Sequence, residues 1–191
     1  MLREEKKARA RAAMAGAAAA LFGEHGYDGV AMTQVARAAG VSEQTLYNYF
    51  PTKESLVFDQ AEAFETSLLA VVGDGEDPIG AARRWLEAFL LGPAAHRALE
   101  SPGGMVRLVA GSDTLRRGLL DLSHRVAGTL AGRLRRAGYA PAAATALADA
   151  LLAVFVRTVE DLGAAANRRA IPAVTRRARE AFEALRPLVR S

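Results

Sequence analysis

The sequence predicts an all-α protein, and three observations lead to that prediction. Ala, Leu, Arg and Glu, which favour helices, are abundant, and hydrophobic residues make up 51% of the 191 positions. β-Branched residues rarely alternate with polar ones, so the period-two pattern of strands is weak. Glycine and proline gather at a few points and divide the chain into segments of helical length. We expect about nine helices, in an N-terminal three-helix domain and a larger C-terminal helical domain.

The helices expected near the N-terminus are separated by tight turns. We predict helices over residues 3–22, 32–39 and 43–49, and then a long fourth helix with Thr52 as its N-cap. Ala31 precedes the second helix and has no side-chain oxygen that can cap it, which costs about 1 kcal/mol. Thr33 is the alternative start of that helix.

Caps and prolines delimit the helices expected in the C-terminal domain. Asp77 is placed to cap a helix that Pro78 begins. Glycine and proline interrupt residues 92–111, which should form two short helices. Three longer helices are then expected, from Ser112 to about 137, from Pro141 to about 162 and from Pro172 to about 185.

The helix expected at 141–162 is apolar on nearly every face. Such a helix has to be buried nearly all round, and near the end of a small domain this favours a core on one side and a partner on the other. A two-fold dimer is the simplest such arrangement. The candidate dimer interface, from this helix and the last one, consists of Leu147, Leu151, Val154, Thr158, Phe182 and Leu185.

Composition and charge limit the class of protein further. The formal charge is +4 and the pI about 9.8, which is weakly in favour of a nucleic-acid partner. The absence of cysteine excludes disulfides and thiolate metal sites. The basic residues before the run 12–22 resemble the start of a signal peptide, but the run is mostly Ala and a turn follows it. Residues 140–156 are short for a membrane span and contain Asp149, so we expect a cytoplasmic protein.

Residues 35–50 have the pattern of a helix-turn-helix. Gly40 permits a left-handed backbone at the turn, and Ser42 is placed to cap the second helix. Val41 and Leu46 should fill the junction between the two helices. The side chains left facing outward are Glu43, Gln44, Thr45, Tyr47 and Asn48. In such a motif the second helix enters the DNA major groove.

The outward residues suggest two kinds of DNA contact. Gln44 and Asn48 share a face, and their amides can bond adenine, while Thr45 offers a methyl group to thymine. Glu43 is the fourth candidate for base reading, or it serves only the positive N-terminus of its helix. The candidates for phosphate binding are Thr33, Ser42, Tyr47, Tyr49 and Lys53. Either tyrosine could instead pack against the first helix, and the basic residues among positions 1–11 could also approach phosphates.

Residues 14–56 resemble the DNA-binding domain of the TetR family of bacterial regulators. The resemblance rests on the strings 21–29 (LFGEHGYDG), 35–42 (VARAAGVS) and 45–56 (TLYNYFPTKESL), and Ala31 departs from it, because Ser or Thr is common there. It implies a DNA-binding domain at 1–52 and a ligand-binding and dimerisation domain at 53–191. It also implies a homodimeric repressor on a near-palindromic operator, released when an effector in the C-terminal core moves the fourth helix.

The effector site is expected in the C-terminal half, where an apolar lining would suit a small hydrophobic or aromatic compound. The candidate lining residues are Trp85, Phe89, Met105, Leu108, His124, Phe155 and Val159, each of which could equally be ordinary core. The histidines lack metal-ligand spacing, and no paired nucleophile and base is visible, so we expect no metal, no cofactor and no enzyme activity. The alternative is a DNA-binding regulator without a small effector, constitutive or switched by a protein partner that contacts residues 92–111.

Overall fold

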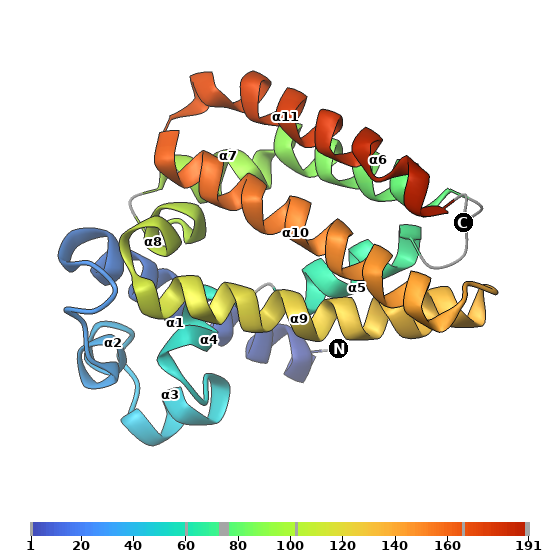
Figure 1. The fold of residues 1–191 in the computed structure, drawn as a ribbon. Coiled ribbons are helices and arrows are strands. Elements are labelled where there is room, and N and C mark those ends of the chain that lie inside the picture. Colours follow the sequence, from blue (N-terminus) through green and yellow to red (C-terminus); the bar gives the residue numbers. More distant parts are fainter. Residues whose placement is uncertain (1, 60, 73–76, 102, 166, 190–191) are drawn as a thin grey trace.

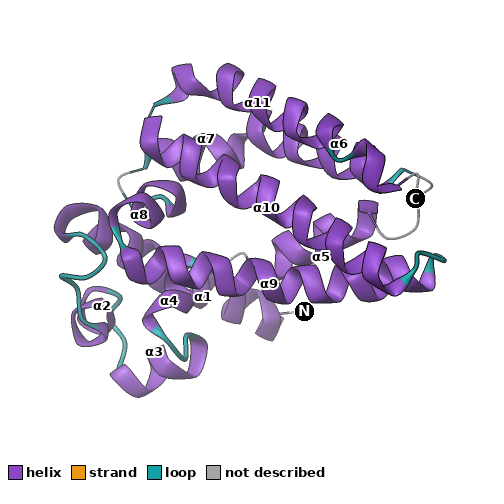
Figure 2. Ribbon diagram, viewed as in Figure 1, coloured by secondary structure: helices purple, strands orange, loops and turns teal. Residues whose placement is uncertain are grey.

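The computed structural model describes residues 2–59, 61–72, 77–101, 103–165 and 167–189 (Figure 1). Every regular element within these ranges is a helix, as the sequence predicts (Figure 2). The first four helices form one end of the molecule, and α6 and α11 lie at the opposite side.

The N-terminal helices are α1 (Leu2–His25), α2 (Met32–Ala38), α3 (Glu43–Tyr49) and α4 (Lys53–Val57). Helix α1 packs against α2 and α4, and α2 packs against α3. Their shared core consists of Met14, Ala18, Phe22, Tyr27, Val30, Met32, Val35, Ala36, Leu46, Phe50 and Leu56. Because α4 packs on α1, the helix after the predicted boundary at 52/53 is part of this packing unit; the boundary itself stays a prediction.

The C-terminal helices are α5 (Ala61–Val72), α6 (Pro78–Leu91), α7 (Pro93–Glu100), α8 (Met105–Gly111), α9 (Asp113–Arg136), α10 (Pro141–Ala165) and α11 (Ile171–Ala184). Short 3-10 turns at Arg168–Ala170 and Arg186–Val189 flank α11. Helix α10 is central, because it packs against α6, α8, α9 and α11. It is long and apolar enough to cross a membrane, but 56% of its most apolar stretch is buried in the protein, as in a core helix.

Four predicted helix caps are confirmed by hydrogen bonds. The Ser42 side chain accepts from the Thr45 amide and that of Thr52 from the Ser55 amide. Asp77 and Ser112 accept from the amides of Gly80 and Leu115. The two short helices expected within 92–111 are α7 and α8.

The fourth helix differs from the expectation. Instead of one long helix from Thr52, the chain forms α4, leaves helical geometry at Phe58 and resumes with α5 at Ala61. Phe58 has φ −95° and ψ 30°, although its amide still donates to the Glu54 carbonyl. The break therefore lies between the N-terminal and C-terminal helices.

The start of α2 agrees with the prediction of a helix from residue 32, and the alternative start at Thr33 is wrong. The helix begins at Met32 with Ala31 as its N-cap, so Thr33 lies inside the first turn and does not start the helix. Ala31 has no side-chain oxygen to cap α2. A side chain of the helix instead bonds back to the cap residue: Gln34 accepts from the Ala31 amide at 2.7 Å. This is one half of a capping box.

Candidate nucleic-acid interface and apolar cavity

The turn and the core side chain Leu46 hold α3 in place. Gly40 has φ 67°, and the Val41 amide donates to the Ala36 carbonyl at 3.0 Å, which closes the turn between α2 and α3. Leu46 is fully buried on the inner face of α3. Helix α3 therefore presents its outer face at the edge of the molecule, far from α11 (Figure 1).

The predicted base-reading residues lie on this outer face. Glu43, Gln44 and Asn48 are exposed, and the Gln44 amide donates to Asn48 Oδ1 at 3.1 Å. The two amides thus form one polar surface with free donors and acceptors for base edges. Thr45 is half-buried, and its hydroxyl lies 2.8 Å from Ser42 Oγ, so its methyl group is the part left for a base.

Four of the predicted phosphate-binding residues lie in α2, in α3 or in the turn between them, and they differ in exposure. Thr33 and Tyr47 are exposed at the protein surface. Ser42 is exposed too, but its hydroxyl is engaged as the cap of α3. Tyr49 is half-buried and packs against the N-terminal core, which matches the packing alternative for this residue. The phosphate-binding role of all four stays a prediction.

Lys53 is engaged within the protein. Its ammonium donates to the carbonyls of Tyr27 and Val30, both at 3.0 Å, and lies 4.1 Å from the centre of the Tyr27 ring. Lys53 therefore attaches the start of α4 to the loop after α1, and one N–H bond of its ammonium remains for a phosphate. Beside it, burial opposes ionisation of Glu54, but the amide at the start of α4 and then Thr52 and Lys53 lower its pKa overall.

An apolar cavity of about 190 Å³ lies beside the break between α4 and α5. Its walls come from α4 to α10 and consist of Val57, Phe58, Ala61, Phe64, Phe89, Ala98, Met105, Leu119, Leu122 and Phe155. Three of the predicted lining residues, Phe89, Met105 and Phe155, are among them. The sequence analysis missed the wall from α4 and α5, whose only sequence signal was the pair of aromatic residues Phe58 and Phe64.

The other predicted lining residues lie elsewhere. Trp85 is in a second layer, stacked on Phe89 and edge-on to Phe64, with its indole N–H donating to Ser67 Oγ at 3.1 Å. Leu108 and Val159 are buried in the general core and are not part of the cavity wall. Periodicity shows that a residue faces inward, not which neighbours surround it, so these three residues are not in the cavity wall, and their contact with an effector stays a prediction.

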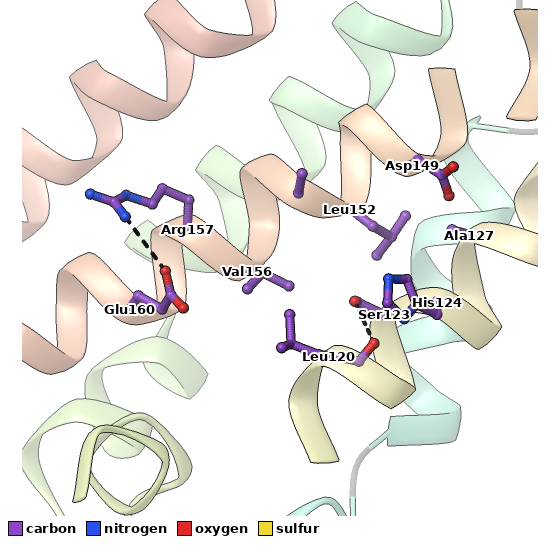
Figure 3. A pocket seen from close by; sticks show the side chains of 10 residues that line it. Leu120, Ser123, His124, Ala127, Asp149, Leu152, Val156, Arg157 and Glu160 are labelled. Atoms are coloured by element: carbon purple, nitrogen blue, oxygen red, sulfur yellow. Dashed lines mark hydrogen bonds and ion pairs between the residues drawn. The ribbon is translucent and has the colours of Figure 1, made fainter. Parts of the chain in front are cut away.

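His124 lines a surface groove and not the cavity. This groove between α9 and α10 has a volume of about 640 Å³, and Figure 3 shows His124 and Asp149 in its wall. Further along, the Arg157 guanidinium lies 3.7 Å from Glu160. The groove is open and has charged residues at its rim, so it differs in chemistry from the apolar cavity.

The predicted dimer interface needs a correction. Leu147, Leu151 and Phe182 are 0%, 3% and 2% exposed, so they pack inside the chain and cannot contact a partner. Val154, Thr158 and Leu185 line a second groove, of about 710 Å³, between α10 and α11. The outer face of α10 between the two grooves is a ridge formed by Asp149, Ala150, Ala153, Arg157 and Glu160.

Comparison with known proteins agrees with this geometry. Residues 16–59 match the model of the bacterial regulatory proteins of the tetR family. A TetR-family regulator from Streptomyces coelicolor A3 is 22% identical, with 96% of each chain covered and a TM-score of 0.62. A putative TetR-family transcriptional regulator from Mesorhizobium loti MAFF303099 is 24% identical, with 93% of this chain and 95% of that chain covered and a TM-score of 0.54. No curated protein matches the sequence.

The helix-turn-helix and the helical C-terminal part together have the fold of these two solved structures. Within this fold, residues 16–59 are the part that matches the tetR family of bacterial regulatory proteins.

Proposed function

We propose that the protein is a dimeric transcriptional repressor that a small apolar effector releases from a near-palindromic operator. The observation that carries this proposal is the position of the cavity. Val57 and Phe58 form part of its wall, and they directly follow the α4 residues that are fixed to the N-terminal domain. A compound that fills the cavity therefore presses on the segment that joins it to the DNA-binding helices.

The cavity limits the class of effector. All its lining residues are apolar, and a volume of about 190 Å³ suits a compound of about one aromatic ring. A charged compound would lose its hydration without gaining a partner in this wall. Uncharged single-ring or small two-ring compounds are the expected class.

A thermal-shift measurement tests the effector site. Toluene and indole should raise the melting temperature of the protein, whereas benzoate, which is similar in size but charged, should not. Ala61→Leu places a larger side chain in the wall and should abolish the shift while keeping the fold. If neither neutral compound stabilises the protein or weakens DNA binding, the alternative regulator without a small effector is favoured.

The DNA-reading role of α3 is tested by removing both exposed amides. We expect the Gln44→Ala and Asn48→Ala double variant to lose preference for the operator and to keep weak, salt-sensitive binding to any duplex. The operator is obtained by selecting from a random duplex library with the wild-type protein. Unchanged preference would show that these residues do not read bases.

For the dimer we propose that the outer ridge of α10 is the contact, with the two-fold axis near Ala153. Asp149 and Arg157 lie on either side of Ala153 at equal spacing, so the axis would bring each aspartate next to the partner's arginine. The small side chains of Ala150 and Ala153 allow two helices to approach closely. The adjacent groove, with Val154, Thr158 and Leu185, would receive side chains of the second copy.

Sedimentation tests this contact. Ala153→Arg should produce monomers with an unchanged helical spectrum, because the residue is exposed and the core is untouched. Ala88→Arg on the exposed face of α6 is the matched control and should stay dimeric. Dimers of Ala153→Arg that are as stable as the wild type would place the interface elsewhere.

A further inference from the structure

Arg11 of α1 joins the C-terminal end of α3 to the break between α4 and α5. Its Nε donates to Asp59 Oδ1 at 2.6 Å, and its Nη1 donates to the Tyr49 carbonyl at 2.9 Å. The guanidinium carbon also lies 4.4 Å from the centre of the Phe50 ring. The Arg11 side chain thus contacts both the C-terminal end of α3 and the segment after α4. Asp59 is 48 positions away from it in the sequence.

The contact with Tyr49 fixes the C-terminus of α3. The last carbonyls of a helix have no partner in the helix, and a cation there is favourable for the helix dipole. Helix α3 has only seven residues, so its direction depends on how its two ends are held. The N-terminal end is held by the Gly40 turn, and the C-terminal end by Phe50 in the core and by Arg11.

The contact with Asp59 connects this end of α3 to the cavity. Asp59 lies between Phe58 and Ala61, which are both in the cavity wall. The Phe58 ring also packs against α9, where a Cβ atom on Gly118 would come within 3.0 Å of it. Because α9 lies against Phe58 on that side, a compound that widens the cavity would move the segment that contains Asp59 and would not push Phe58 towards α9.

We propose that Arg11 is a positioning residue for DNA recognition, and that the Arg11–Asp59 pair transmits the position of the cavity wall to α3. In the paired state, α3 is held in the orientation in which Gln44 and Asn48 read bases. When Asp59 moves, the guanidinium loses its partly buried carboxylate partner and holds Tyr49 less firmly. This inference rests on the proposed function, because it assumes an operator and an effector.

The surroundings of the Arg11 guanidinium favour a role in positioning α3 over direct binding of a phosphate. The Asp59 side chain is only 14% exposed, while that of Arg11 is 41% exposed, so the ion pair is partly shielded from water. Two of the guanidinium's donating nitrogens are already used on acceptors within the protein. Pairing with the partly buried Asp59 carboxylate offsets the charge of Arg11, which leaves less of it to attract a phosphate.

Asp59→Asn separates the two roles in the full-length protein. The measurement is the ratio of the dissociation constants for a scrambled duplex and for the operator selected by the wild type, over a series of salt concentrations. If Arg11 positions α3, this ratio falls about tenfold, the effect of one charge-assisted hydrogen bond, with an unchanged salt slope for the scrambled duplex. If Arg11 is a phosphate contact, the variant frees it, both duplexes bind more tightly and the salt slope rises by about 1, which would overturn the proposal.

Two further variants complete the test. Glu62→Gln removes one negative charge from an exposed position on α5 and should leave the ratio unchanged. Arg11→Lys keeps the charge but cannot reach both acceptors, so its loss should equal that of Asp59→Asn, and the double variant should be no worse than either. If the double variant lowers the ratio by the product of the two single effects, Arg11 and Asp59 act independently, which would contradict their action as a pair. A wild-type protein that selects no operator would overturn the proposed function itself, whereas a selected operator with an unchanged ratio for Asp59→Asn overturns only the positioning role.

Discussion

The helix-turn-helix and the apolar cavity are assembled from different kinds of contact. In the helix-turn-helix, the residues that shape the turn and the cap, Gly40, Ser42 and Leu46, lie within a single short stretch of sequence. The cavity wall, in contrast, takes residues from Val57 to Phe155. A short pattern can specify the first kind of site completely, whereas the second exists only after distant helices have packed.

This difference explains what could be predicted from the sequence. The caps at Ser42, Thr52, Asp77 and Ser112 depend on residues three positions apart, and all four are confirmed. The inward direction of Phe89, Met105 and Phe155, which line the apolar cavity, followed from helical periodicity, and effector binding there stays a prediction.

The failures arise from long-range contacts. The break after α4 interrupts a helix-forming sequence, and it occurs where Asp59 bonds to Arg11 in another helix. Leu147 and Leu151 were assigned to a partner, because periodicity cannot distinguish the face that packs on the protein's own core from the face that meets a second copy. His124 was placed in the cavity for the same reason, and it lies in the groove between α9 and α10.

Gly103→Ala should have the largest effect on the contact between the N-terminal region (α1 to α4) and the C-terminal region (α5 to α11). A Cβ atom at this position would overlap the backbone of Ala19 in α1, so either the segment before α8 or α1 has to move. We expect a loss of about 3 kcal/mol in the free energy of unfolding, measured in urea. Gly111→Ala is the control, since a Cβ there meets nothing within 4 Å. A loss of less than 1 kcal/mol would mean that the two regions touch more loosely than this glycine suggests.

Asp77→Asn tests a cap that belongs entirely to the C-terminal region. The Gly80 amide lowers the pKa of Asp77, partly opposed by burial, and Arg186 lowers it further. A lowered folded-state pKa gives stability that is present above the unfolded pKa and lost as pH falls through the folded value. Asparagine caps as well as aspartate, so the variant should lose at most about 1 kcal/mol at pH 7 and unfold with a shallower acid dependence. Thermal melts between pH 7 and pH 2 measure this, and an unchanged acid dependence would show that Asp77 is not one of the groups responsible.

The smallest expected effects address whether the two regions unfold together. Gly16 in α1 and Gly128 in α9 are exposed helical positions where an added Cβ meets nothing within 4 Å. Alanine at either site should raise the free energy of unfolding by about 0.5–1 kcal/mol, mainly through the lower entropy of the unfolded chain. Each change is local, so any effect on the other region has to pass through the contacts between them.

Trp85 fluorescence measures the unfolding of the C-terminal region, because Trp85 is the only tryptophan of the chain and lies in α6. The two regions are joined by the close packing of Gly103 on Ala19, by the bond from Ser112 to Asp28 at 3.3 Å and by Phe58 against Gly118. If these contacts make the protein one cooperative unit, Gly16→Ala shifts the Trp85 fluorescence midpoint as far as Gly128→Ala does. If Gly16→Ala leaves that midpoint in place, the helix-turn-helix unfolds separately, and a signal from the cavity would have to pass through the Arg11–Asp59 pair and the α4 connection without support from a rigid shared core.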